Sequence, residues 1–182
     1  EQLLELLVAA AVDLGITKPA PSKFHRHFRT KVPFMALVDI ITSVQKITGF
    51  AVDLFKDNPE LTKKEADRSE FFARVTVCVD VFQNRPKGRW KVDALKASAS
   101  AGSVTGDSLQ NALKLMLAFI RAGQECKAGG DGCVKKCADA VAMAINRNQQ
   151  EYALPTDNAS TVETVSGRTG ASTGRESPSL ET

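Results

Sequence analysis

The stretch FMALVDIITSVQKITGFAVDLF, residues 34–55, decides the fold class of this chain. Its large apolar residues recur three or four positions apart, and polar residues such as Asp39 and Lys46 fall between them. This spacing places the apolar side chains on one face of an α-helix. Gly49 lies inside the pattern and indicates a bend or a close contact with another helix. We therefore predict one helix over residues 34–55, with its apolar face in a protein core.

Upstream, residues 1–14 predict a second helix, which is apolar over more than one face. Gly15 is a suitable C-cap, and Pro19 and Pro21 stop any continuation of the helix. A helix with this much apolar surface is either buried or paired with a partner. Its candidate interface residues are Leu3, Leu4 and Leu7.

Downstream, Thr62 and Glu65 have the spacing of a capping box at the start of a helix. We predict a helix from there to about Asn84. The valines between residues 75 and 81 alternate as in a strand, but together with neighbouring phenylalanines they also cover one helical face. Three further helices are predicted over residues 90–97, 109–122 and 134–148.

Glycine and serine separate these helices. Gly123 is expected to end the helix over residues 109–122, and residues 98–106 and 129–132 are expected loops. From residue 154 onward the chain is rich in Thr, Ser, Gly and Glu, and its few apolar side chains cannot offset the entropy of ordering it. The prediction is an all-α bundle of five to seven helices in one domain, residues 1–153, followed by a disordered tail, residues 154–182.

The composition agrees with a helical domain and does not identify a partner. At 182 residues the chain is long enough to bury a core. Since aromatic residues make up only 6% of it, we expect a core built mainly from Ala, Val, Leu and Ile. The formal net charge of +3 divides into −2 on the tail and +5 on the rest. A charge of this size permits binding to a polyanion without requiring it.

Two basic clusters are the candidate polyanion-binding sites. Their members are Lys23, Arg26, Arg29 and Lys31 in the first cluster, and Arg85, Lys87, Arg89 and Trp90 in the second. The cations suit the phosphates of nucleic acid or of lipid headgroups, and the tryptophan suits stacking on a base. The alternative is structural: a solvated basic face anchored by Phe24 and Phe28, and a tryptophan that closes a helical core.

The cysteines form one unusual group. Cys133 and Cys137 stand four positions apart, one above the other on a helix, and Cys126 precedes them across a glycine-rich segment. Three readings stay open: a disulfide from Cys126 to one of the pair, reduced thiols, or part of a metal site that lacks a fourth ligand. Cys78 lies among valines and is expected to be an inert core residue.

No catalytic motif is present in the sequence. It contains no phosphate-binding loop, no GxGxxG, no HExxH and no GxSxG. His25 and His27 are the only imidazoles, so a catalytic Cys–His pair would need a distant partner, such as Cys137 with His25. We predict a non-enzymatic protein without a cofactor.

The leading functional hypothesis is a protein–protein interaction or self-assembly module, because the first helix is so apolar. The second is polyanion binding by the two basic clusters, as in a nucleocapsid-like protein. Two further alternatives are a membrane-active bundle, in which residues 3–14 insert beside a basic segment, and a secreted carrier of an apolar ligand. The sequence does not indicate a compartment.

Overall fold

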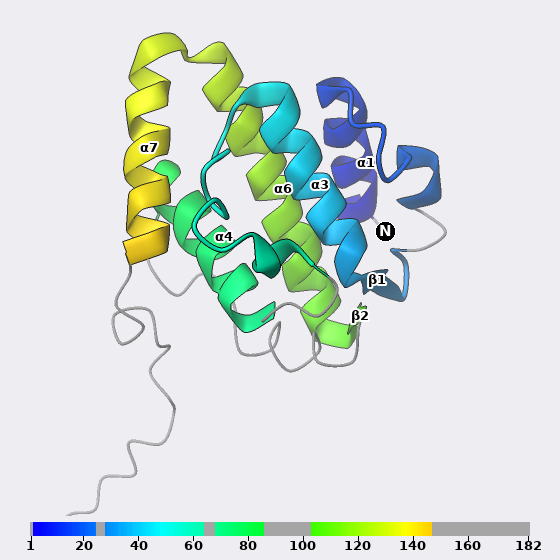
Figure 1. The fold of residues 1–182 in the computed structure, drawn as a ribbon. Coiled ribbons are helices and arrows are strands. Elements are labelled where there is room, and N and C mark those ends of the chain that lie inside the picture. The colour runs from blue at the N-terminus through cyan, green and yellow to red at the C-terminus, as the bar shows by residue number, and fades with distance from the viewer. Residues whose placement is uncertain (1, 25–27, 64–67, 86–102, 147–182) are drawn as a thin grey trace, which may run out of the picture.

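The computed structural model describes residues 2–24, 28–63, 68–85 and 103–146 (Figure 1). These ranges contain five α-helices and two three-residue strands, so the predicted all-α class is confirmed. The tail, residues 154–182, and the helix predicted over residues 90–97 lie outside the described ranges.

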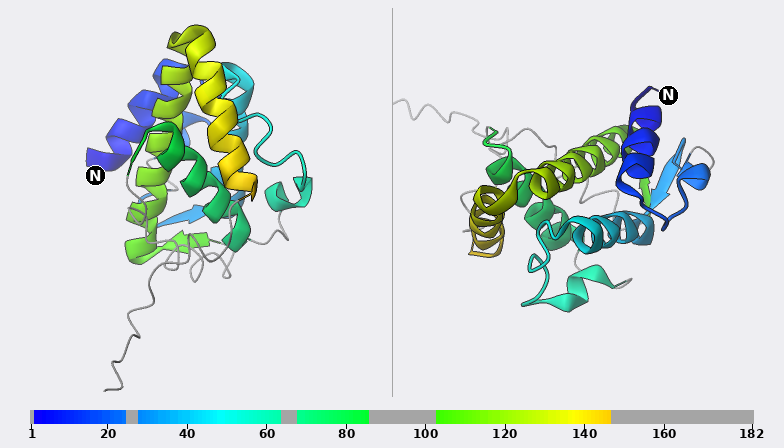
Figure 2. Two further views of the ribbon diagram at one scale, coloured as in Figure 1. Left: turned by 90° about the vertical axis from the view of Figure 1, so that its left-hand side faces the viewer. Right: turned by 90° about the horizontal axis from the view of Figure 1, so that it is seen from above.

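The elements surround one long central helix, α6. In chain order they are α1 (Gln2–Leu14), the 3-10 helix η1 (Pro21–Lys23), β1 (Lys31–Pro33), α3 (Phe34–Thr48), the 3-10 helix η2 (Pro59–Thr62), α4 (Arg68–Phe82), β2 (Ser103–Thr105), α6 (Gly106–Ala128) and α7 (Gly130–Asn146). α6 contacts α1, α3, α4 and α7, and α4 also packs along α7. Seen from above, α1 lies toward one end of α6 and α7 toward the other, while α3 runs alongside α6 (Figure 2).

A short antiparallel ribbon ties the segment before α3 to the start of α6. β1 pairs with β2 so that Val32 lies opposite Val104, and both valines are fully buried. Two strands alone are marginally stable in water, so this ribbon depends on the helices beneath it.

Phenylalanine contributes more to the core than the low aromatic content suggested. All nine phenylalanines of the chain are buried. The ring of Phe50 packs edge-on against Phe82 and Phe119, with centroid distances of 4.8 and 5.0 Å. A second group joins Phe71 to Phe34 and to Phe55, at 4.9 and 5.2 Å. Aliphatic residues still fill most of the core, as expected, but aromatic pairs occupy its centre.

Three predicted helix boundaries are wrong at glycine. The last helix was predicted to begin at residue 134, after a loop over residues 129–132, but α7 begins at Gly130. The helix predicted over residues 34–55 ends at Thr48, because Gly49 adopts φ 74° and its N–H donates to the Gln45 carbonyl as a C-cap. The helix predicted to end at Gly123 instead continues to Ala128. The apolar pattern misled at both glycines, since it continues past Gly49, where the helix ends, and stops at Gly123, where the helix goes on.

The valine-rich segment agrees with the prediction, whereas the capping box at residue 62 is not tested. The Thr62 hydroxyl donates to the Pro59 carbonyl inside η2, and Glu65 lies outside the described ranges. Residues 75–81 are helical, as predicted. Almost every side chain of α4 is buried, and this explains why its sequence shows no clear polar face.

Gly123 lies where α6 crosses α3. A Cβ atom at this position would lie 2.5 Å from Cγ1 of Val44, which is closer than side chains approach one another. We expect Gly123→Ala to destabilise the protein by roughly 1–2 kcal/mol, since overpacking costs about 1–3 kcal/mol and improved helix propensity returns only part of it. Urea unfolding of the variant measures this cost.

The double variant Gly123→Ala/Val44→Ala provides the control. Removing the valine methyl groups makes room for the new Cβ, so the two substitutions should be less damaging together than the sum of their separate effects. Strictly additive effects would show that the close approach of α3 and α6 does not depend on this glycine.

Candidate functional site

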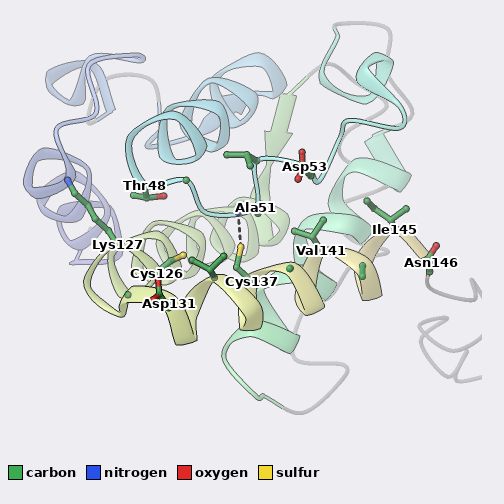
Figure 3. A pocket seen from close by; sticks show the side chains of 16 residues that line it. Thr48, Ala51, Asp53, Cys126, Lys127, Asp131, Cys137, Val141, Ile145 and Asn146 are labelled. Atoms are coloured by element: carbon green, nitrogen blue, oxygen red, sulfur yellow. Dashed lines mark hydrogen bonds between the residues drawn. The ribbon is translucent and has the colours of Figure 1, made fainter.

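An open groove of about 720 Å³ runs beside α7, and we call it the α7 groove. One wall is residues 48–53, which lead out of α3. The other wall is one face of α7 from Gly130 to Asn146, and Cys126 and Lys127 of α6 lie at one end (Figure 3). Most of the lining is apolar, which is the usual character of a binding site.

The α7 wall follows from helical spacing. Val134, Cys137, Val141 and Ile145 recur three or four positions apart and therefore share one face of the helix. Figure 3 shows this face running from Asp131 at one end of the groove to Ile145 and Asn146 at the other.

The opposite wall is formed by the start of the segment that connects α3 to η2. We call this segment, residues 49–58, the groove loop. Ala51 adopts φ 54°, a conformation that costs an L-residue about 1–2 kcal/mol. Its N–H donates to Cys137 Sγ at 3.1 Å, and its carbonyl accepts from Gln45 Nε2 at 2.6 Å. Hydrogen bonds on both sides of Ala51 thus hold a strained backbone against α7, the kind of local strain often found at functional sites.

The groove loop is also attached to the core by a buried arginine of α4. Only 7% of the Arg74 side chain is exposed, and its guanidinium forms ion pairs with Asp57 of the loop and with Glu70 one helical turn away. A further hydrogen bond runs from Arg74 to the Leu54 carbonyl, at 3.1 Å. The hydrogen bond from Arg74, opposed by partial desolvation, lowers the pKa of Asp57, and Asp57 in turn raises the pKa of Arg74.

The two walls present apolar side chains to solvent. Val52 on the loop is 56% exposed and Val134 on α7 is 63% exposed, and both line the groove. Met143, 44% exposed, lies on the same helix outside the lining. Large apolar side chains gathered at the mouth of a groove are typical of a surface that binds a partner.

The structure brings together the three cysteines that the sequence grouped. The chain reverses between α6 and α7, so that Cys126 and Cys137 line the same α7 groove and Cys133 lies beside the turn at Gly129. All four cysteines are free thiols, and Cys78 is buried in the core as expected. Burial, with the neighbouring thiols, raises the pKa of Cys126 to about 12, and burial also raises the pKa of Cys137 and of Cys78. These three thiols are therefore protonated at neutral pH.

The metal reading of the cysteines finds no support among the described residues, where no three potential ligands are placed to hold a metal ion. A pairing of Cys137 with His25 is not tested, because His25 and His27 lie outside the described ranges.

Only part of the basic clusters can be located. Lys23, Arg29 and Lys31 are exposed between η1 and β1, whereas Arg26 lies outside the described ranges. Phe24 and Phe28 are buried and stacked, with ring centroids 4.6 Å apart, so they anchor this segment as the structural alternative expects. Arg85 is exposed just beyond α4. The remaining members of the second cluster, Lys87, Arg89 and Trp90, lie outside the described ranges.

The candidate interface on α1 divides into buried and exposed positions. Leu4 and Leu7 are 4% and 0% exposed in the core, and Leu3 packs partly buried against it. The apolar side chains that α1 presents to solvent are instead Leu6 and Val12. Within the described ranges, no helix combines the length and apolar content needed to cross a membrane.

Comparisons of the chain with protein-family models, with curated proteins and with solved structures found no match.

The groove itself could not be recognised from the sequence. Val52 belonged to a segment predicted as helix, and Val134 to the start of another helix. The useful signal was a set of small residues on one face of α7, Gly130, Ala138 and Ala142, at spacings of eight and four. Small residues on an otherwise apolar face leave room for another chain segment.

Proposed function

We propose that this protein is a non-enzymatic protein-binding module, and that the α7 groove takes an amphipathic helix of a partner protein. The observation that carries the proposal is the pair of solvent-exposed valines, Val52 and Val134, on opposite walls of one apolar groove. Burying a valine side chain contributes about 1.5–3 kcal/mol, so two of them supply a useful share of a binding free energy.

The shape of the groove favours an elongated occupant. Its α7 wall extends from Gly130 to Asn146, which corresponds to roughly 24 Å along a helix axis. A helix of about four turns has this length and would lie with its apolar face in the groove, a common mode of peptide recognition. Ala138 and Ala142 on the wall would let the backbone of such a helix come close.

The charges at the rim suit the polar face of such a helix. Lys127 and Asp131 lie at one end of the groove, and Asp53 lies on the loop wall. Asp53 is paired with exposed Lys56 at 3.4 Å. Charges of both signs at a rim set the orientation of a partner more than they raise its affinity.

The test begins with a photo-cross-linking amino acid in place of Ala142 in the full chain. The cross-linked segment is identified by mass spectrometry, synthesised as a peptide, and titrated against the purified protein by calorimetry. We expect an apolar, helix-forming segment. Val52→Glu/Val134→Glu should weaken its binding at least about tenfold, since each lost apolar contact is worth about one factor of ten.

Val12→Glu is the matched control, because Val12 is 58% exposed on α1, away from the groove. Binding that survives Val52→Glu/Val134→Glu but is lost in Val12→Glu would transfer the interface to α1 and refute the proposal. So would a cross-linked segment that binds with equal affinity to all variants.

Light scattering coupled to size exclusion, with absorbance at two wavelengths, separates the competing functions. A defined oligomer that Val134→Glu dissociates would make a second copy of the chain the occupant of the groove. A particle that carries nucleic acid and falls apart in salt would instead favour the basic clusters. Either result would overturn the assignment to a partner helix.

A further inference from the structure

Three thiols meet where α6 turns into α7. Cys126 stands in the last turn of α6, and it lines the α7 groove together with Cys137 of α7. Cys133 lies beside the turn at Gly129, where an added Cβ atom would lie 2.9 Å from Cβ and 3.0 Å from Sγ of Cys133. A side chain at position 129 would therefore displace Cys133.

The two neighbours of Cys126 are not equivalent. Cys133 Sγ donates to the Glu125 carbonyl, at 3.6 Å, and so is directed into the helical turn. Cys137 lines the α7 groove together with Cys126, and its Sγ accepts the N–H of Ala51 at 3.1 Å. Because Cys137 shares the groove with Cys126, whereas Cys133 is hydrogen-bonded into the helical turn, Cys137 is the better placed of the two to react with Cys126.

Accessibility decides which sulfur reacts first. Cys126 is half-buried, whereas Cys133 and Cys137 are only 7% and 8% exposed. An oxidant in solution therefore reaches Cys126 first. The buried thiols can react only afterwards, with the mixed disulfide formed at Cys126.

We propose that Cys126 and Cys137 form an intramolecular disulfide on exposure to low-molecular-weight disulfides, while Cys133 remains a thiol. The Cys126 thiolate attacks one sulfur of the reagent, forms a mixed disulfide and releases one reagent thiol. The Cys137 thiolate then attacks Cys126 Sγ, forms the protein disulfide and releases the second reagent thiol. The two protein thiols are oxidised, the reagent is reduced to two thiols, and the two protons of the cysteines pass to these thiols.

The disulfide would join α6 to α7 on the floor of the groove. It would close a loop through the Gly129 turn and restrain the unfolded chain, so the oxidised protein should unfold at a higher urea concentration. Because the pKa of Cys126 is raised to about 12, its thiolate is scarce at neutral pH and closure is slow. The pair would thus respond to sustained oxidising conditions and not to brief ones.

Peptide mapping can test the pairing directly. The reduced full chain is incubated with glutathione disulfide at about pH 8, its remaining thiols are alkylated, and it is digested with trypsin. Lysines at positions 127, 135 and 136 separate the three cysteines into different tryptic peptides. The expected product joins the peptide of Cys126 to that of Cys137, with Cys133 alkylated.

Two variants and one stability measurement complete the experiment. Cys133→Ser should form the same disulfide, whereas Cys126→Ser should lower the disulfide yield at least about tenfold. A link from Cys126 to Cys133, or a mixed disulfide at Cys126 that never resolves, would overturn the proposal. The experiment detects a covalent bond, so its result does not depend on whether the groove binds a partner helix.

Discussion

Replacing Phe50 by alanine should lower the free energy of unfolding by about 3–5 kcal/mol, as for other fully buried phenylalanines. Phe50 is 0% exposed, and its ring packs edge-on against Phe82 of α4 and Phe119 of α6. The residue follows the Gly49 cap directly, so its ring attaches the start of the groove loop to the centre of the core. Urea unfolding followed by far-ultraviolet circular dichroism measures the loss.

Two controls show whether the effect belongs to this ring. Phe50→Leu keeps most of the apolar volume and should cost clearly less than Phe50→Ala. Val52→Ala, two positions along but 56% exposed, should change stability by no more than about 0.5 kcal/mol. If Phe50→Ala cost under about 1 kcal/mol, the ring would not hold the loop to the core, and the groove wall would need another anchor.

The second large effect is expected at the other end of the loop. Arg74→Met should destabilise the protein by about 3 kcal/mol, at the lower end of the range for breaking a buried ion pair. The lower end applies because Asp57 keeps 44% of its side chain exposed and can recover water, whereas the Leu54 carbonyl loses its donor. Methionine preserves the apolar stem, so the loss reports on the guanidinium alone.

Lys63→Met is the matched control, since it breaks the exposed Lys63–Glu60 pair, whose side chains are 59% and 70% exposed. Such surface pairs contribute only about 0–1 kcal/mol. Equal losses for Lys63→Met and Arg74→Met would show that burial does not strengthen the Arg74 pairs.

The contribution of the Arg74–Asp57 pair should depend on pH. Arg74 lowers the pKa of Asp57 below its ordinary value of 3.8, so the folded state binds the proton of Asp57 less readily than the unfolded state does. The pair therefore contributes fully above pH 3.8, and its contribution is lost as the pH falls through the lowered pKa of the folded state. The stability difference between wild type and Arg74→Met should accordingly be constant near neutral pH and shrink in acid. A difference that grew in acid would contradict the pairing.

The sequence predicted the helices better than it predicted the site. Periodic apolar residues identified α1, α3 and α7, and the phenylalanines of α4 correctly outweighed its strand-like valines. Glycine was the main source of error, because one residue type serves two purposes. At Gly49 the backbone adopts a positive φ, whereas at Gly123 the absence of a side chain lets a neighbouring helix come close. Only the fold distinguishes the two cases.

The candidate site depends on contacts between distant residues, which the local sequence pattern does not predict. The cysteine spacing indicated that Cys126 could fold back toward Cys133 and Cys137 across a glycine-rich segment, and Cys126 and Cys137 do line one groove. The groove loop could not be placed in this way. Its position depends on Arg74 and on Cys137, which lie far away in the sequence and were predicted only as parts of helices.

The hydrogen bond between Ala51 and Cys137 joins positions 86 residues apart. A ribosome adds about 5–20 residues per second, so roughly 4–17 seconds separate the synthesis of the two ends of this bond. Throughout that interval the nascent chain carries one wall of the groove without the helix that faces it. Val52 and its neighbours then lack the helix that they face in the folded protein, and the α7 groove forms only once α7 has left the exit tunnel and docked.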